Sequence, residues 1–247
     1  IVSEWMEHGD VMSYLENYPR ANRVELITDV ARGLEYMHAS GLVHGDLKSR
    51  NVLVDSLGYA RLSDFGLATT VLGTATLAPT AGSSANWGSF RYMAPELSDI
   101  EEKGKTLTWK SDVYAFGMTA WEIFAERHPF YNIPHELVVL LKVRDGKRPE
   151  RPLHARALGL DDFIWSNVIS SCWVARPSER PRILEVLNRL QWYKTARRLI
   201  AKLLDEGLAE VDRQVLDEML STGWPRCHVP TSSVLNSHRD GQGCYIQ

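Results

Sequence analysis

Cysteine is scarce in this sequence. The 247 residues include three cysteines, Cys172, Cys227 and Cys244, which lie far apart along the chain. A disulfide framework or a zinc site needs more cysteines, or cysteines and histidines at short regular spacings. The sequence therefore argues against both, and it favours reduced thiols. We expect a cytoplasmic protein on this ground.

An excess of charge and long apolar runs are missing as well. Lys and Arg total 28 while Asp and Glu total 31, which gives a formal net charge of −3. A nucleic-acid partner would call for a concentrated basic face, and a membrane-spanning helix for about 20 consecutive apolar residues. We expect neither, and the start of the chain shows no basic-then-apolar leader for secretion.

The composition that is present, 44% hydrophobic and 24% charged, is ordinary for a globular protein. Apolar residues at helical spacing predict a helix over residues 24–38. Ser111 and Asp112 are expected to cap a helix that runs to about Ala125. Further helices are expected over about 135–145, 161–173, 182–193 (with room to continue, since no Pro or Gly occurs again until Gly207) and 208–220.

Two short strands are expected between these helices. The segments 51–54 and 59–62 flank Asp55-Ser56-Leu57-Gly58, whose turn chemistry predicts a hairpin. Residues 68–90 are rich in Ser, Thr, Ala and Gly and show no persistent period, so we expect a long mobile loop there.

Three short motifs succeed one another along the first hundred residues. They are His44-Gly45-Asp46 with Asn51 five residues later, Asp64-Phe65-Gly66, and Ala94-Pro95-Glu96. Each motif alone is weak, because a turn Asp-Gly or a buried Phe explains it equally well. Together and in this order they are specific.

The chemistry of these motifs fits phosphoryl transfer. That reaction needs a carboxylate at the attacking hydroxyl and oxygen ligands for Mg²⁺ near the phosphates. The predicted hairpin would bring Asp46, Asn51 and Asp64 to one end of a small sheet. Lys48 would offset charge on the transferred group.

The motif order resembles the C-terminal lobe of a protein kinase domain, over roughly residues 1–192. The segments 44–51 and 88–96 are similar to those of tyrosine-kinase-like (TKL-type) Ser/Thr kinases. The resemblance implies a mainly α fold, a helical bundle with a small β-hairpin at the catalytic cleft. We expect a C-terminal helical extension over residues 193–221 and a disordered tail over 222–247.

The resemblance also implies roles for the motif residues. Asp46 would be the catalytic base and Lys48 a phosphate contact, while Asn51 and Asp64 would bind Mg²⁺. The cofactors would be ATP and Mg²⁺, and the partners would be protein substrates that carry Ser or Thr.

The first ten residues resemble the kinase hinge that holds the nucleotide. Ser3 would take the gatekeeper place, and backbone groups of Glu4 and Met6 would bond adenine. Asp10 would lie near the ribose, and Leu53 would form the floor under adenine.

Four other positions match residues that the resemblance implies stabilise the kinase fold. Asp112 would bond the backbone of the catalytic loop, although a plain helix cap would also explain it. Arg180 resembles the ion-pair partner of Glu96, and His44 and Phe65 would stack in the core.

The sequence departs from the family pattern in two ways. Gly45 stands where the family usually has an Arg that holds a phosphorylated loop. We therefore expect no control through that Arg clamp, and the sequence leaves open whether Arg61 or Arg91 replaces it. A Gly-rich loop, a strand Lys and a helix Glu are not found before the hinge, so the N-terminal lobe would be missing and the isolated chain a poor enzyme. The alternative is a non-catalytic, pseudokinase-like binding or scaffold protein.

The last four residues, Cys244-Tyr245-Ile246-Gln247, match a prenylation box that favours farnesyl. One lipid chain without a polybasic cluster would give only a weak membrane tether. The alternative is a plain disordered end. The sequence carries no signal for an oligomeric state.

Overall fold

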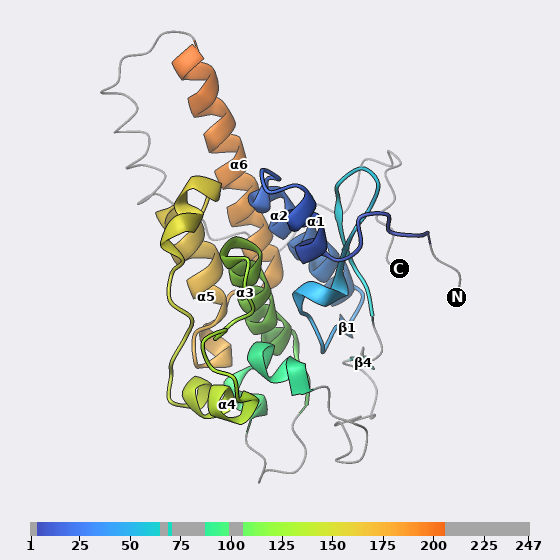
Figure 1. The fold of residues 1–247 in the computed structure, drawn as a ribbon, viewed down its shortest axis with the longest axis vertical. Helices are drawn as coiled ribbons and strands as arrows, with labels where there is room; N and C mark the ends of the chain where they lie inside the picture. Colours follow the sequence, from blue (N-terminus) through green and yellow to red (C-terminus); the bar gives the residue numbers. More distant parts are fainter. Residues whose placement is uncertain (1–3, 65–68, 71–86, 99–105, 206–247) are drawn as a thin grey trace, which may run out of the picture.

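The structure is a computed structural model that describes residues 4–64, 69–70, 87–98 and 106–205. This part of the chain is mostly helical, with two small sheets (Figure 1). The α-helices are α1 (Val11–Asn17), α2 (Arg23–Ala39), α3 (Trp109–Ala125), α4 (Glu136–Arg144), α5 (Ser170–Cys172) and α6 (Ile183–Asp205). The strands are β1 (Leu42–Val43), β2 (Val52–Val54), β3 (Ala60–Leu62) and β4 (Thr69–Thr70). Short helical turns are η1 (Ser49–Asn51), η2 (Trp87–Tyr92), η3 (Pro95–Leu97), η4 (Leu153–Leu158), η5 (Ile164–Ile169) and η6 (Pro177–Glu179).

Helix α3 forms the centre of the core. All its residues from Ser111 to Ala125 are buried, which is typical of a helix that is surrounded by protein. It contacts α2 and α5, while α2 also packs against α6 and β3. Figure 1 shows α6 as a long helix whose far end projects beyond the other elements.

The predicted hairpin is present. β2 and β3 pair antiparallel with Val52 opposite Leu62 and Val54 opposite Ala60. The turn between them closes because Asp55 exchanges hydrogen bonds with the backbone of Tyr59.

The prediction of one continuous loop over residues 68–90 is wrong at its two ends. Thr69–Thr70 forms β4, which pairs with β1 through Leu42↔Thr70 and Val43↔Thr69, and Trp87–Tyr92 forms η2. The partner strand β1 lies far away in sequence, so no local pattern could indicate this pairing. Residues 71–86 lie outside the described residues.

Most of the predicted helices that fall in the described residues are confirmed, with differences in their ends and in their winding. α2 and α4 lie where they were expected, and α6 continues to Asp205. The region 161–173 is helical, but Ile164–Ile169 is wound as a π-helix. α1 was not predicted, although Asp10 caps it by accepting from the amides of Met12 and Ser13.

The predicted caps of α3 are partly wrong. The N-cap is Thr108, and Ser111 completes a capping box with it. Asp112 lies one residue further along, and its carboxylate bonds the backbone of another segment instead of the helix end.

The predicted helix over 208–220 and the tail from 222 lie outside the described residues. Among the residues that are described, no helix is both long and apolar enough to cross a membrane.

Candidate active site

The segment from His44 to Asn51 is held in place by one buried carboxylate of α3. Asp112 accepts hydrogen bonds from the backbone amides of His44 (2.8 Å) and Gly45 (2.9 Å). His38 of α2 places its Nε2 atom 2.9 Å from the same carboxylate. The predicted contact between Asp112 and the catalytic-loop backbone is therefore confirmed.

Gly45 sits in a backbone conformation that favours glycine. Its φ angle is +82°, a region that residues with a Cβ atom enter only at an energetic cost. Glycine at this position avoids that cost, and it offers no side-chain donor.

Both arginines considered as a replacement already pair with acidic side chains. Arg61 pairs with Asp55 at 2.9 Å and lies over the ring of Tyr59. Arg91 is buried and donates to the carboxylate of Glu136 and to the carbonyls of Pro129, Phe130 and Ile133. With its guanidinium committed to four acceptors, Arg91 serves to anchor η2 to the segment before α4.

Three of the predicted catalytic residues are in direct contact. The Nζ atom of Lys48 lies 2.6 Å from Oδ2 of Asp46. The amide nitrogen of Asn51 donates to the carbonyl of Asp46 at 2.7 Å and reaches its Oδ2 at 3.2 Å. The loop thus fixes the orientation of the Asp46 carboxylate from two sides.

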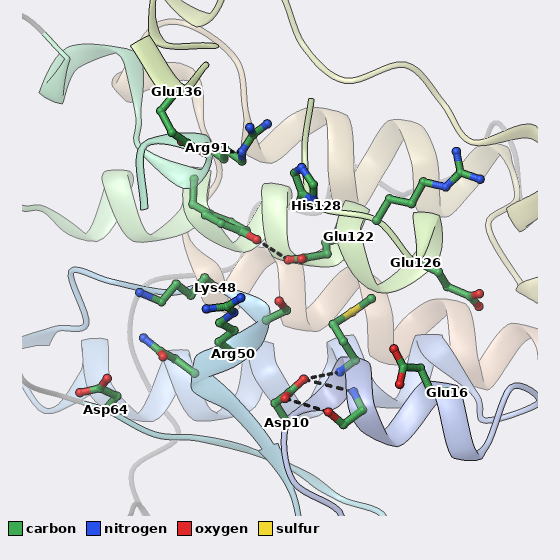
Figure 2. A pocket seen from close by; sticks show the side chains of 16 residues that line it. Asp10, Glu16, Lys48, Arg50, Asp64, Arg91, Glu122, Glu126, His128 and Glu136 are labelled. Atoms are coloured by element: carbon green, nitrogen blue, oxygen red, sulfur yellow. Dashed lines mark hydrogen bonds and ion pairs between the residues drawn. The ribbon is translucent and has the colours of Figure 1, made fainter. Parts of the chain in front are cut away.

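A cleft of about 790 Å³ opens beside these residues (Figure 2). Lys48, Asn51 and Asp64 all line it. Asp64 has a φ of +59°, an uncommon conformation that Asp tolerates better than most residues. The hairpin thereby brings Asp64 to the same cleft as Asn51, as the sequence predicted.

The donor set fits a hard divalent cation. Since the amide nitrogen of Asn51 bonds Asp46, its amide oxygen is the atom left to meet a metal, and Asp64 offers carboxylate oxygens. Oxygen ligands of this kind suit Mg²⁺. Within the described ranges, no three His, Cys, Asp or Glu side chains gather as a metal site, so a cation here would rest on these two side chains, on water and on a ligand.

Two of the predicted nucleotide contacts, Asp10 and Leu53, meet at the hairpin. Asp10 and Leu53 form an antiparallel bridge, and Val54 donates its amide to the carbonyl of Gly9 at 2.9 Å. Asp10 lines the cleft, but both its carboxylate oxygens already accept hydrogen bonds from the first turn of α1. Glu4, Met6 and Leu53 are not among the residues that line this cleft.

A buried polar cluster below the cleft was not predicted. The phenol of Tyr92 donates to Oε2 of Glu122 at 2.7 Å, and Ser49, which lines the same cleft, is buried as well. The available signal was an acidic residue inside the apolar stretch 121–125 of α3, where a solvent-facing Glu is not expected.

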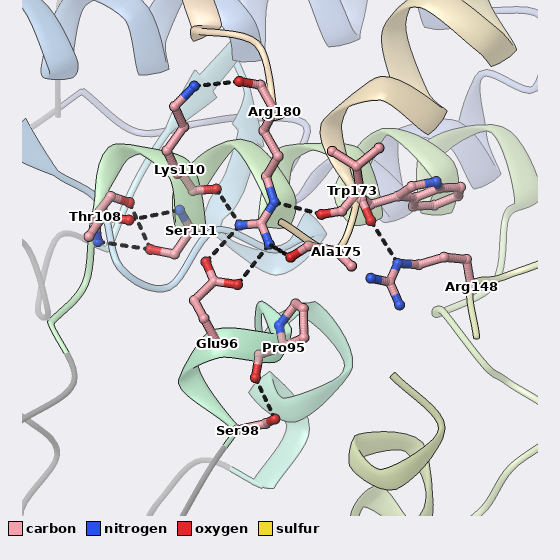
Figure 3. Close-up of polar contacts among 11 residues, drawn as sticks. Pro95, Glu96, Ser98, Thr108, Lys110, Ser111, Arg148, Trp173, Ala175 and Arg180 are labelled. Atoms are coloured by element: carbon pink, nitrogen blue, oxygen red, sulfur yellow. Dashed lines mark hydrogen bonds and ion pairs between the residues drawn. The ribbon is translucent and has the colours of Figure 1, made fainter. Parts of the chain in front are cut away.

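The predicted pair of Glu96 and Arg180 is present (Figure 3). The guanidinium makes two parallel hydrogen bonds of 2.7 Å to the carboxylate. It also donates to the carbonyls of Val174, Lys110 and Ala175. The Arg180 side chain is fully buried, and removal of one partner from such a pair costs about 3–5 kcal/mol.

Of the predicted stacking pair His44 and Phe65, only His44 lies among the described residues. His44 is buried as expected. Its predicted partner Phe65 lies outside the described residues, so the stacking itself stays a prediction.

The comparisons with known proteins agree with this geometry. The family model described as protein tyrosine and serine/threonine kinase matches residues 1–190. A serine/threonine/tyrosine-protein kinase of Arabidopsis thaliana is 31% identical over 198 residues, which cover 78% of this chain and 47% of that protein. Receptor-interacting serine/threonine-protein kinase 1 of Homo sapiens is 32% identical over 196 residues, which cover 73% of this chain and 28% of that protein.

The chain thus spans less than half the length of either relative. The family model, in contrast, accounts for more than three quarters of the chain itself, and its range includes the loop from His44 to Asn51, Asp64 and the Glu96 segment. The chain belongs to the protein tyrosine and serine/threonine kinase family.

Proposed function

We propose that this chain supplies the catalytic base and the metal ligands of a TKL-type Ser/Thr protein kinase, as the C-terminal lobe of its kinase domain. The observation that supports this most directly is the contact of Asp46 with both Lys48 and Asn51 on one loop. Lys48, Asn51 and Asp64 line the cleft beside it, although Asp46 itself does not. The two relatives are named as a serine/threonine/tyrosine-protein kinase and a serine/threonine-protein kinase, which supports the same reaction.

In this proposal Asp46 orients the substrate hydroxyl and accepts its proton as the γ-phosphoryl group is attacked. Lys48 and Asn51 hold the carboxylate in one orientation, which is the positioning on which phosphoryl transfer depends. Lys48 also places a positive charge where negative charge gathers on the transferred group.

Mg²⁺ and ATP would be held by different parts of the site. Asn51 and Asp64 would bind the cation through their side-chain oxygens. The backbone of Glu4 and Met6, with Asp10 and Leu53, would hold the nucleoside end. When bound, Mg-ATP supplies the phosphoryl group and neutralises part of its charge.

The remaining contacts to ATP would come from other parts of a longer protein. No Gly-x-Gly-x-x-Gly stands before Asp10 in this sequence. Each charged hydrogen bond that is lacking weakens binding by about 1.5–3 kcal/mol. We therefore expect the 247 residues alone to bind Mg-ATP weakly and to transfer phosphate slowly.

The decisive test is phosphotransfer by the longest natural product of the gene that contains this chain. It would be incubated with Mg²⁺, γ-labelled ATP and peptides that carry Ser, Thr or Tyr. We expect label on Ser and Thr, and a fall of about a hundredfold or more in Asp46→Asn, the effect of losing a catalytic base. Asp145→Asn is the matched control, since Asp145 is an exposed carboxylate at the end of α4, outside the cleft.

Two results would contradict the proposal. Equal label incorporation by wild type and Asp46→Asn would remove Asp46 from the chemistry. A folded product that transfers no phosphate at all would favour the non-catalytic binding or scaffold protein instead.

A cytoplasmic location and a farnesyl group on Cys244 are further proposals. Cys244 lies outside the described residues. The intact mass of the protein from a eukaryotic host tests the lipid, because an unmodified C-terminus would contradict it.

A further inference from the structure

The cleft beside the catalytic loop carries more charged side chains than the proposed chemistry uses. Its volume of about 790 Å³ leaves room for more than a transferred phosphoryl group. Figure 2 shows Lys48 and Arg50 on one side of the cleft and Glu16 on the other. Lys48 has a role in the proposed reaction, whereas Arg50 has none.

Most carboxylates of the cleft are already bound within the protein. Asp10 accepts from the first turn of α1, Glu122 from Tyr92, Glu126 from Arg23 and Glu136 from Arg91. A ligand would have to displace one of these contacts before it could use the group. These carboxylates therefore contribute little to the choice of a ligand by its charge.

Arg50 differs from them in its exposure and in its contacts. It belongs to η1, directly precedes Asn51, lines the cleft and is exposed. Its guanidinium makes neither an ion pair nor a hydrogen bond with another residue of the described ranges. Its N–H donors are therefore available to a ligand from this part of the chain.

The chemistry and the place of Arg50 indicate which ligand group would use those donors. A guanidinium is a planar fork that fits a carboxylate or a phosphate with two parallel hydrogen bonds. The neighbouring Asn51 donates to the carbonyl of Asp46 at 2.7 Å. An anion held by Arg50 would therefore lie close to the hydroxyl that Asp46 is proposed to orient.

The rest of the cleft does not present a single sign of charge. Glu16 in α1 and Arg127 after α3 both line the cleft and are both exposed. Burial, and then the positive charge of Arg91, lower the pKa of His128, so this side chain is neutral at neutral pH. The selective charge thus stands next to the catalytic loop, and it is positive.

We propose that Arg50 is a specificity-determining residue, which selects protein substrates that carry an anionic side chain next to the acceptor Ser or Thr. The anion is a carboxylate or a phosphate, since the guanidinium fits both. The place of the acceptor beside Asp46 rests on the proposed function. The attraction of an anionic peptide to Arg50 does not.

Direct binding tests this attraction without catalysis. Labelled peptides that differ only in the two residues flanking a Ser, which are Glu, phosphoserine or Lys, are titrated with the whole chain at neutral pH and low ionic strength. By fluorescence anisotropy we expect the anionic peptides to bind about tenfold or more tightly than the Lys peptide. A further gain of more than about tenfold for phosphoserine over Glu would assign a phosphate, and a smaller one a carboxylate.

Arg50→Gln removes the charge and the fork from an exposed position. We expect the preference for anionic peptides to fall to within about twofold of none. Arg156→Gln is the matched control, because Arg156 is an exposed arginine of η4 outside the cleft, and it should keep the wild-type preference. Equal binding of the Glu and Lys peptides by the wild type, or a preference that survives Arg50→Gln, would overturn the proposal.

The catalytic part is tested on the longest natural product, by phosphotransfer from γ-labelled ATP to the Glu and Lys peptides. We expect kcat/KM to be about tenfold higher for the Glu peptide, chiefly through KM for the peptide, and Arg50→Gln to abolish this difference while KM for ATP stays within about twofold. An active Arg50→Gln enzyme with the wild-type ranking of peptides would overturn the proposal. If the wild type labels no peptide, the proposed function fails, and the binding experiment still decides whether Arg50 attracts anionic peptides.

Discussion

At the scale of single residues, Cys172 shows how burial alone sets the chemistry of a side chain. It ends α5 and is fully buried. Burial raises the pKa of its thiol to about 12. Since the thiolate and not the thiol is the nucleophile, the folded protein presents an unreactive cysteine here.

We predict that iodoacetamide does not label Cys172 in the folded chain between pH 7 and about pH 10. A raised pKa keeps the group protonated as the pH rises through the ordinary thiol range, and burial excludes the reagent. Mass spectrometry of the peptide that contains Cys172 checks this, with the urea-unfolded chain as the labelled control. Labelling at equal rates in the two states would contradict the prediction.

Roles of residues in ordered motifs were predictable from the sequence. Roles that depend on which residues meet in space were predicted only in part. The contact of Asp112 with the loop backbone was expected from the family resemblance and is present. Its interpretation as a helix cap was wrong, because Thr108 caps the helix four residues earlier. The bond between Tyr92 and Glu122 joins residues 30 positions apart, and neither residue carries a local signal for the other.

At the scale of elements, Gly117 decides how closely α3 approaches α5. A Cβ atom on Gly117 would lie 2.9 Å from the Cβ atom of Cys172 and 3.3 Å from the carbonyl oxygen of Ile169. Both neighbours are held by a buried element, so neither yields easily. The close packing of the two helices requires glycine at this point.

We predict that Gly117→Ala lowers the free energy of unfolding by about 1–3 kcal/mol through overpacking. Helix propensity alone would give the opposite sign, since Ala is favoured over Gly by about 1 kcal/mol. Gly33→Ala in α2 is the comparison, because its new Cβ atom would meet only side-chain atoms of the buried Leu62, at 3.1 Å, and we expect a smaller loss of stability there. Urea unfolding compares the two, and a stabilised Gly117→Ala would contradict the packing argument.

Elements with a long regular period were predictable, and short or tertiary ones were not. The apolar spacing of residues 24–38 located α2 almost to its ends. α1 has seven residues, too few to establish a period. The π-helical winding of Ile164–Ile169 leaves no mark on apolar spacing that distinguishes it from an α-helix.

At the scale of the molecule, α6 runs through the end of the family-matched part of the chain. The helix crosses residue 192, the end of the predicted kinase domain, without a break. Beyond that residue Tyr193 donates its hydroxyl to Asp161 at 2.6 Å, Lys194 pairs with Glu25 of α2, and Ile200 is buried. The first part of the predicted extension is therefore packed onto the body.

We predict that a chain ending at residue 192 is less stable than one ending at residue 205 by about 3–5 kcal/mol, the cost of losing a large buried side chain and its cavity. The chain that ends at residue 205 is the matched control, because the two differ only in the helical segment 193–205. Urea unfolding of both measures the difference. Equal stability would mean that the domain boundary at 192 holds as predicted.

The sequence could thus indicate the helical class, the hairpin and the loop with Asp46 and Asn51, because motif order and apolar period are local properties. It could not indicate the pairing of β1 with β4, whose residues are about 27 positions apart. The commitment of Arg91 to four acceptors likewise depends on where η2 docks. Those features belong to the assembled molecule.

The unbroken course of α6 has a mechanical consequence. Its 23 residues form a rod of about 35 Å at 1.5 Å per residue. The base of this rod packs against α2, and its tip projects past the other helices of the described part of the chain (Figure 1). A continuous helix transmits bending and rotation along its axis instead of absorbing them. A force applied at Asp205 would therefore act on α2 through a long lever arm.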